Sequence, residues 1–287
     1  MLNALLIANA RSGAAGRLAD VDVPGRWVLD PSAVTGEDVA GADLLAFFAG
    51  DGTVQVTLSQ LLRTLPVEAL PPVAMLPFGT TNMNAKDINH RQRRRAAAAS
   101  LTRVIRTGRF EPLTRSLLRI EDGVRVEHGF FFGMGVIAEV VARWHAERGA
   151  ATATNQIRMV RAMASALTGI SALHAVDLYG QPTTVYGLLA TTLDRLLLGS
   201  RPFWGGGRPG DLRVTWIDAN AKHLLRRAPA LLRGNAGLEH VPGYESRAPD
   251  HLTLSFTGPY ILDGEIFHPN GQSLTIQRSE PVTWIAL

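Results

Sequence analysis

The stretch "LLAFFAGDGTVQVTLSQLL", residues 44–62, decides the fold of the first part of the chain. Leu44–Phe48 is a short, continuous apolar run, which is typical of a strand buried on both faces of a parallel sheet. After the turn, apolar residues return at helical spacing, at Val54, Leu58, Leu61 and Leu62. The stretch therefore predicts a strand, a tight turn and a helix.

The turn itself, "GDGT", has two interpretations. Glycines permit positive φ and close approach of a ligand to the backbone, and the start of the next helix offers free N–H groups and a positive dipole end to an anion such as phosphate. Alternatively, this is an ordinary turn in which Asp51 bonds neighbouring amides and Thr53 caps the helix. The motif alone does not decide between the two.

Composition bounds the chemistry. The chain has 287 residues, of which 46% are hydrophobic and 19% charged, and this length is enough for two hydrophobic cores. There is no cysteine, which excludes disulfides, thiolate metal sites and cysteine nucleophiles. Catalysis must therefore use oxygen and nitrogen groups.

The charge favours anionic partners. The net charge is +4, and a basic run "HRQRRR" spans residues 90–95. Such a run suits phosphates or anionic lipid surfaces, although it is also typical of a solvated helix face. No nucleic-acid-binding module is recognisable, so no nucleic-acid partner is expected. The N-terminal "MLNALLIANARSG" lacks a basic region before its apolar run and predicts a first strand, so we expect a cytoplasmic protein without a transmembrane segment.

Up to about residue 107, strands and helices alternate, which predicts a parallel sheet covered by helices. The expected strands are "ALLIANA", "RWVLD", "DLLAFFAG" and "PVAMLPFG". Ligands of such sheets bind beyond the carboxyl ends of the strands. Asn9, Asp51 and Gly79 each follow an expected strand, so one ligand could contact all three loops.

From about Glu111 the chain becomes mostly β. The expected strands are "TRSLLRI", "VRVEHGFFFGMG", "TTVYGLLAT", "DRLLLGS", "DLRVTWID", "HLTLSFTG" and "GEIFHP", and the expected helices are "GVIAEVVARWHAERG" and "TNQIRMVRAMASALTGI". The segment "RPFWGGGRPGD" predicts a loop. An exposed strand edge in this part could pair two subunits into a homodimer.

Five motifs in order now carry a resemblance. "IANARSG", "AGDGT", "LPFGTTN", "FFGMGVIAEV" and "ILDGEIF" together resemble the diacylglycerol-kinase-like lipid kinase family, which includes bacterial lipid kinases and sphingosine kinases. The "GDGT" motif is similar to that of NAD kinases and phosphofructokinases, whereas "LPFGTTN" and the late "DGE" favour the lipid kinases.

The resemblance implies an α/β plus mostly-β fold with the active site between two domains. The first is an ATP-binding, parallel-sheet domain of the NAD kinase and phosphofructokinase type over residues 1–112, completed by 275–287 if the last segment returns to it. The second is a β-sandwich-like lipid-substrate domain over residues 113–274. ATP and Mg²⁺ are the implied cofactors.

The resemblance implies functional residues at the positions that match the family's motifs. The nucleotide-binding residues implied by the resemblance are Asn9, Ser12, Gly13, Gly50, Gly52, Thr53, Gly79, Thr80 and Asn82. The implied catalytic residues are Asp51, Asp263 and Glu265, with Asp51 also acting on the phosphates through Mg²⁺ or its water shell, or as proton acceptor. Glu265 is the better general base, although the sequence does not decide between it and Asp51. If "LDGE" is extended, Asp263 and Glu265 share a face; if it is a tight turn, both are turn residues.

Some positions depart from the family pattern. Ala49 replaces the first glycine of the phosphate motif and Ala10 replaces a proline. Met83 stands where many relatives have an aspartate, while Lys86 and Asp87 resemble the ending found in a bacterial sub-branch. These changes leave ATP binding intact as an expectation and put the acceptor lipid in question. Asp211 in "RPGDLRV" matches the structural metal loop of relatives too poorly to be assigned to it.

The function expected from these residues is Mg²⁺-dependent transfer of the ATP γ-phosphate to a hydroxyl of diacylglycerol or a similar lipid. The protein would contact the membrane peripherally, through Trp144, Trp204 and the basic residues Arg91–Arg95. Two alternatives stay open. One is a small-molecule kinase of the NAD kinase type, and the other is a non-catalytic nucleotide- or lipid-binding regulator of the same fold.

Overall fold

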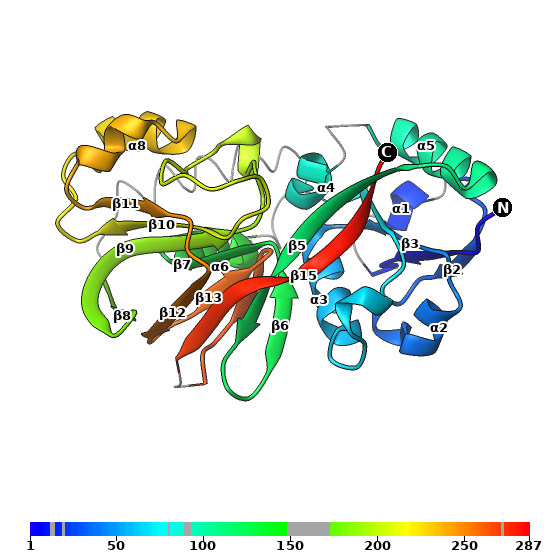
Figure 1. Cartoon of the computed structure of the whole chain (residues 1–287), viewed down its shortest axis with the longest axis horizontal. Coiled ribbons are helices and arrows are strands. Elements are labelled where there is room, and N and C mark those ends of the chain that lie inside the picture. The colour runs from blue at the N-terminus through cyan, green and yellow to red at the C-terminus, as the bar shows by residue number, and fades with distance from the viewer. Residues whose placement is uncertain (12–14, 19–20, 80, 89–92, 148–172, 271–272) are drawn as a thin grey trace. The chain divides into compact units, whose positions relative to one another are not determined.

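The computed structural model describes the chain except for residues 12–14, 19–20, 80, 89–92, 148–172 and 271–272 (Figure 1). It divides into two compact units, Met1–Leu117 with Ser279–Leu287, and Leu118–Arg278. The boundaries expected from sequence lay at 112/113 and 274/275. The observed boundaries lie four or five residues further along the chain. Both fall inside long strands that pass from one unit to the other, β5 (Glu111–Glu121) and β15 (Leu274–Ala286).

The first unit contains the expected parallel sheet. Its strands β1 (Ala4–Ala8), β2 (Arg26–Val28), β3 (Leu44–Ala49) and β4 (Val73–Pro77) pair in the order β2-β1-β3-β4, and β15 adds to β4 through Trp284 and Val73. Every residue of β1 and β3 is buried, which explains why both read as unbroken apolar runs.

The helices of this unit have identifiable ends. They are α1 (Ala15–Leu18), α2 (Gly36–Ala40), α3 (Asp51–Leu61), α4 (Met83–Ile88) and α5 (Arg94–Thr107), with 3₁₀ turns at Pro31–Ala33 and Val67–Ala69. Thr35 and Asp38 form a reciprocal capping box at the start of α2. Gly108 ends α5 with φ of 69°, a left-handed conformation that glycine adopts without strain. The apolar face of α5, including Leu101 and Ile105, packs into the core with the sheet.

The second unit is built on antiparallel strands. These are β6 (Val126–Gly129), β7 (Phe131–Gly135), β8 (His174–Leu178), β9 (Gln181–Thr191), β10 (Arg213–Asp218), β11 (Tyr244–Arg247), β12 (His251–Phe256), β13 (Tyr260–Leu262) and β14 (Glu265–Phe267). The first part of β9 pairs with β8, and its second part lies between β7 and β10. Because β9 has three partners, the sheet branches around one core. The predicted fold class, an α/β domain with a parallel sheet and a β-rich domain, is confirmed.

Some predicted elements of this unit differ in the structure. "DRLLLGS" is not a strand, because Leu197–Gly199 forms a 3₁₀ turn that ends in a glycine with φ of 76°. "VRVEHGFFFGMG" is two strands separated at Phe130. The helix predicted over 135–149 is confirmed as α6 (Val136–Glu147), whereas the helix predicted over 154–170 lies outside the described residues. Helix α8 (Leu224–Arg233) and the 3₁₀ turn Ala236–His240 were not predicted.

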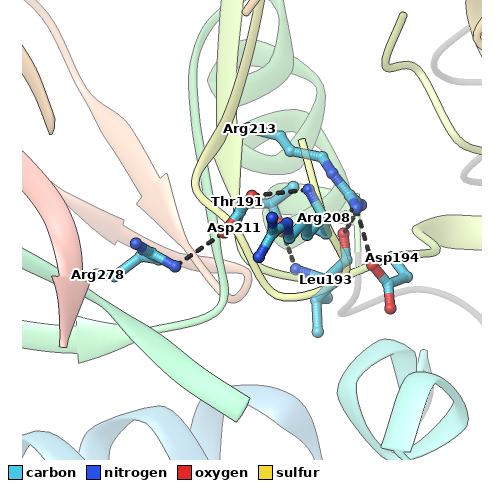
Figure 2. A network of polar contacts seen from close by, with 7 residues as sticks. All are labelled: Thr191, Leu193, Asp194, Arg208, Asp211, Arg213 and Arg278. Atoms are coloured by element: carbon cyan, nitrogen blue, oxygen red, sulfur yellow. Dashed lines mark hydrogen bonds and ion pairs between the residues drawn. The ribbon is translucent and has the colours of Figure 1, made fainter. Parts of the chain in front are cut away.

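The glycine-rich loop before β10 is held by a polar network (Figure 2). Asp211 accepts hydrogen bonds from the Arg208 N–H at 2.6 Å and from Arg278 Nη1 at 2.8 Å. The half-buried Asp194 pairs with Arg213 at 3.0 Å. Both oxygens of Asp211 are therefore used within the loop and its neighbouring strand.

Candidate active site

The loops expected to bind one ligand lie at one edge of the parallel sheet. Ala8 pairs with Phe48, and Phe48 pairs with Leu76, so the carboxyl ends of β1, β3 and β4 are aligned. Asn9, Gly50 and Gly79 follow these ends. The first unit therefore brings the three loops to the edge where α/β sheets bind their ligands.

Two of these loops touch through their backbones. A Cβ atom on Gly79 would overlap the Cα of Gly50, and one on Gly50 would lie 3.2 Å from the Cα of Gly79. Neither glycine has positive φ, and φ of Gly50 is −89°. Glycine is thus required here for close packing of two loops, and the expectation that it supplies positive φ is wrong. Ala49, the departure from the family pattern, ends β3 in ordinary extended backbone.

Asp51 joins the two loops through its side chain. It is 9% exposed, and its two carboxylate oxygens accept hydrogen bonds from the N–H groups of Met83, at 2.9 Å, and Asn84, at 3.1 Å. Burial raises the pKa of this carboxyl, while these two bonds and the charge of Lys86 act in the opposite direction. Asp51 therefore ties the start of α3 to the first turn of α4.

The start of α3 has no side-chain cap. Gly50 is the N-cap residue and the helix start has no side-chain cap hydrogen bond, so the alternative in which Thr53 caps the helix is wrong. Asp51, Gly52 and Thr53 are the first three residues of the helix, whose N–H groups lack intrahelical partners. With the helix dipole, this terminus suits a phosphate group.

Asn9 and Asn82 shape the loops on either side. The Asn9 side chain accepts a hydrogen bond from the Arg11 N–H at 3.0 Å and donates to Thr53 Oγ1 at 3.5 Å, which brings the ends of β1 and β3 together. Asn82 has φ of 49° and bonds both polar groups of Gly79, at 2.6 and 2.8 Å. Asn82 thus closes its own loop. Ser12, Gly13 and Thr80, predicted to bind the nucleotide, lie outside the described residues.

One buried residue beside Asp51 was not predicted. Asn84 is fully buried, and neither polar atom of its side chain has a hydrogen-bond partner among the described residues. A buried amide without partners is costly, so such a group is found where it serves a site or an internal water. The motif "TTNMNA" gave no signal for it, because burial of an asparagine depends on how α4 packs.

The acidic motif of the second unit forms a tight hairpin. Leu262 of β13 pairs with Glu265 of β14, and Asp263 and Gly264 between them have φ of 49° and 93°. These angles and the Asp-Gly sequence are typical of a two-residue type I′ turn. The possibility that this segment is extended, with Asp263 and Glu265 on one face, is therefore wrong.

The two acidic side chains of this hairpin differ in environment. Asp263 is 7% exposed and accepts hydrogen bonds from the N–H groups of Phe130, at 2.9 Å, and Phe131, at 3.0 Å. Glu265 is exposed, and its carboxylate bonds to no side chain or backbone group that the structure describes. Glu265 thus has a carboxylate available to another molecule, whereas Asp263 holds the hairpin onto the start of β7.

A magnesium ion would find few protein ligands. Among the described residues no group of three or more His, Asp or Glu side chains is arranged to hold a metal. Mg²⁺ in kinase sites usually keeps several waters and takes one or two carboxylates together with substrate phosphates. Asp51 beside the α3 terminus fits that mode, since each of its oxygens accepts one N–H and has a further lone pair.

Solved structures with similar folds cover nearly the whole chain. Two are described as a diacylglycerol kinase and a putative diacylglycerol kinase from Bacillus anthracis str. Sterne; they match with TM-scores of 0.65 and 0.68 at 14% and 15% identity, covering 99% of this chain and 97% of theirs. An NAD kinase from Archaeoglobus fulgidus in complex with ATP matches with a TM-score of 0.51 at 12% identity, over 98% of this chain and 93% of that one. Comparison with curated proteins finds no match.

These matches show that the chain shares the fold of these kinases. The family model for the diacylglycerol kinase catalytic domain matches residues 32–112. This match supports a kinase and agrees with the diacylglycerol-kinase-like family identified from the motifs. No helix in the described residues is long and apolar enough to cross a membrane.

Proposed function

We propose that the protein is an ATP-dependent lipid kinase that requires Mg²⁺ and phosphorylates a hydroxyl of diacylglycerol or a similar lipid. The observation that carries this proposal is the uncapped start of α3 beside the Gly50 and Gly79 contact, with Asp51 buried between α3 and α4. Phosphoryl transfer depends mainly on positioning and on charge stabilisation, and this arrangement supplies fixed N–H donors for both.

In the first unit, the N–H groups of Asp51, Gly52 and Thr53 would bind the ATP phosphates. The backbone contact between Gly50 and Gly79 holds the two loops in register, and Asp51 keeps α4 against them. We assign Asn9, Asn82, Ser12, Gly13 and Thr80 to nucleotide binding on the strength of their motifs. Asp51 would hold Mg²⁺, which would supply positive charge to the phosphates.

Glu265 is the proposed general base. Its exposed carboxylate would accept the proton of the lipid hydroxyl as that oxygen attacks the γ-phosphorus. The bond from the γ-phosphorus to the β–γ bridging oxygen breaks, and ADP and a phosphorylated lipid result. Asp263 acts on this step indirectly, since its two hydrogen bonds fix the hairpin that carries Glu265.

The alternative acceptor is a small soluble molecule, and the fold shared with an ATP-bound NAD kinase favours it as the second candidate. A lipid acceptor is preferred because the matched family model is that of the diacylglycerol kinase catalytic domain. A lipid acceptor also implies a cytoplasmic protein that contacts the membrane surface peripherally.

The test is an acceptor panel with γ-labelled ATP and Mg²⁺. Mixed micelles carry diacylglycerol, monoacylglycerol, sphingosine, ceramide or a polyprenol, and NAD is tested in buffer. Label in a lipid that Glu265→Gln abolishes and the exposed control Glu239→Gln retains supports the proposal. Label in NAD alone favours the small-molecule kinase, and ATP binding without transfer to any acceptor favours the non-catalytic regulator.

A further inference from the structure

Helix α8 is fixed to the second unit along one face. The guanidinium group of Arg227 lies over the ring of Tyr244, 5.8 Å from its centroid, and the Tyr244 hydroxyl donates to the Lys222 carbonyl at 3.0 Å. At the other end, the Arg201 N–H donates to the Leu232 carbonyl at 2.8 Å. In Figure 1 the helix lies outside β10 and β11. The position of α8 is therefore set by contacts at both of its ends.

The opposite face of α8 carries two parallel stripes. Leu225 and Leu232 are 55% and 46% exposed and lie seven residues apart, which places them on the same side of the helix. Arg226 and Arg233, also exposed and seven apart, lie next to them around the helix axis. No residue of α8 is buried, so α8 contributes no fully buried side chain to the core.

The charged residues of the segment that carries α8 are all basic. Residues 219–238 contain Lys222, Arg226, Arg227 and Arg233 and neither aspartate nor glutamate. Such a surface complements an anionic partner, and the leucine stripe additionally requires an apolar one. A nucleic acid would satisfy the arginines and leave the leucines in contact with phosphates and water. A bilayer with anionic headgroups satisfies both stripes at once.

We propose that the outer face of α8, formed by Leu225, Arg226, Leu232 and Arg233, docks on the surface of an anionic lipid bilayer. The leucines would enter the boundary between headgroups and acyl chains, and the arginines would pair with lipid phosphates. The proposed function explains why such docking would be useful, because a lipid kinase must reach its acceptor in a membrane, and the docking rests on it only in that respect. The binding itself does not depend on turnover.

Co-sedimentation with vesicles tests the docking on the full chain. Vesicles of phosphatidylcholine alone are compared with vesicles containing phosphatidylglycerol, without ATP. The variants are Arg226→Gln/Arg233→Gln and Leu225→Ser/Leu232→Ser. The matched control is Arg103→Gln/Arg106→Gln, which removes two exposed arginines from α5.

We expect binding to anionic vesicles only, weakened by 0.5 M salt. Loss of two arginines should weaken it about 25-fold, at about fivefold for each basic residue, and loss of the two leucines about tenfold. The α5 control should bind as the unchanged protein does. Circular dichroism and the thermal midpoint verify that each variant is folded, as expected for exposed positions.

The proposal is overturned if the α8 variants bind anionic vesicles as well as the unchanged protein, or if the α5 control loses as much. It is also overturned if the unchanged protein ignores vesicles while a self-associated form disappears in Leu225→Ser/Leu232→Ser, since α8 would then cover a second copy. Phosphorylation of detergent-dispersed lipid is measured separately. Vesicle binding without any lipid phosphorylation would remove the proposed function and leave the docking standing.

Discussion

Two aspartates, one in each unit, occupy the same kind of position. Asp51 accepts hydrogen bonds from the successive N–H groups of Met83 and Asn84, and Asp263 accepts them from those of Phe130 and Phe131. Both side chains are at most 9% exposed. Each carboxylate therefore fixes a neighbouring backbone segment.

The two differ in what they hold. Asp51 opens a helix and holds the start of a second helix beside the edge of the parallel sheet, where we propose that the phosphates bind. Asp263 occupies the left-handed position of a hairpin turn and holds that hairpin onto the start of β7. The comparison shows that an acidic residue in such a motif can act by holding a backbone segment in place. In the second motif only Glu265 then has a carboxylate available to bind another molecule.

The largest expected effect is a loss of activity without a loss of stability, and it distinguishes Glu265 from both aspartates. Glu265→Gln should lower kcat for the acceptor lipid by about 10²- to 10⁴-fold, the usual contribution of a general base, because the amide cannot take the hydroxyl proton. Its free energy of unfolding should change by less than about 0.5 kcal/mol, since the side chain is exposed. Urea unfolding and initial rates measure the two quantities. A variant with full activity would remove Glu265 from the chemistry.

Asp51→Asn and Asp263→Asn should each lower the free energy of unfolding by about 1–3 kcal/mol. In each case, an amide NH₂ would face one of two backbone N–H donors and leave it unsatisfied in a buried place. Asparagine tolerates the left-handed backbone at position 263, so the loss there reflects the hydrogen bond. Asp250→Asn, at an exposed position, is the control in urea unfolding. Unchanged stability would show that these bonds do not hold the loops.

The glycine contact of the first unit predicts a graded pair of effects. Gly79→Ala should destabilise by about 2 kcal/mol and impair ATP binding, because its Cβ would overlap the Gly50 backbone, which has no flexible end to move aside. Gly50→Ala should cost about 1 kcal/mol, since its Cβ meets Gly79 at 3.2 Å. Thermal unfolding and titration with ATP measure both variants. The reverse order would contradict the backbone contact.

Burial lowers the pKa of a histidine, whereas it raises the pKa of the Asp51 carboxyl. Burial, followed by the charge of Arg119, lowers the pKa of His128 from 6.5 to about 4. Between these values the unfolded chain binds a proton that the folded chain does not, so stability falls as the pH falls. From pH 7 to 5.5 this group should remove about 1 kcal/mol from the free energy of unfolding. Urea unfolding of the protein and of His128→Gln at both pH values should show a smaller decrease in the variant; equal decreases would contradict the assignment.

Much of the first unit was predictable from the sequence. Buried parallel strands leave continuous apolar runs, so β1, β3 and β4 could be recognised, and the loops that follow them had to share one edge. This argument predicted that Asn9, Asp51 and Gly79 lie at that edge. The role of the glycines was not, because the approach of Gly50 to Gly79 depends on two loops that are far apart in sequence.

The hydrogen-bond partners of the site's side chains could not be predicted from local sequence patterns. Asp51 bonds to N–H groups more than thirty residues away, and no local pattern predicts them. "LDGE" left two conformations open, and pairing of Leu262 with Glu265 selected the turn. Helix α8 was missed because it contains Pro229 and, having no buried residue, gives no core-facing pattern.

The most direct measurement of the central claim compares kcat for lipid phosphorylation in Asp263→Asn and Glu265→Gln, each corrected for its folded fraction. If Asp263 holds the hairpin and Glu265 takes the proton, folded Asp263→Asn should retain activity within about tenfold of the unchanged protein, while Glu265→Gln loses about 100-fold or more. The opposite order, with Asp263→Asn inactive when folded and Glu265→Gln active, would contradict the account and make Asp263 the catalytic carboxylate.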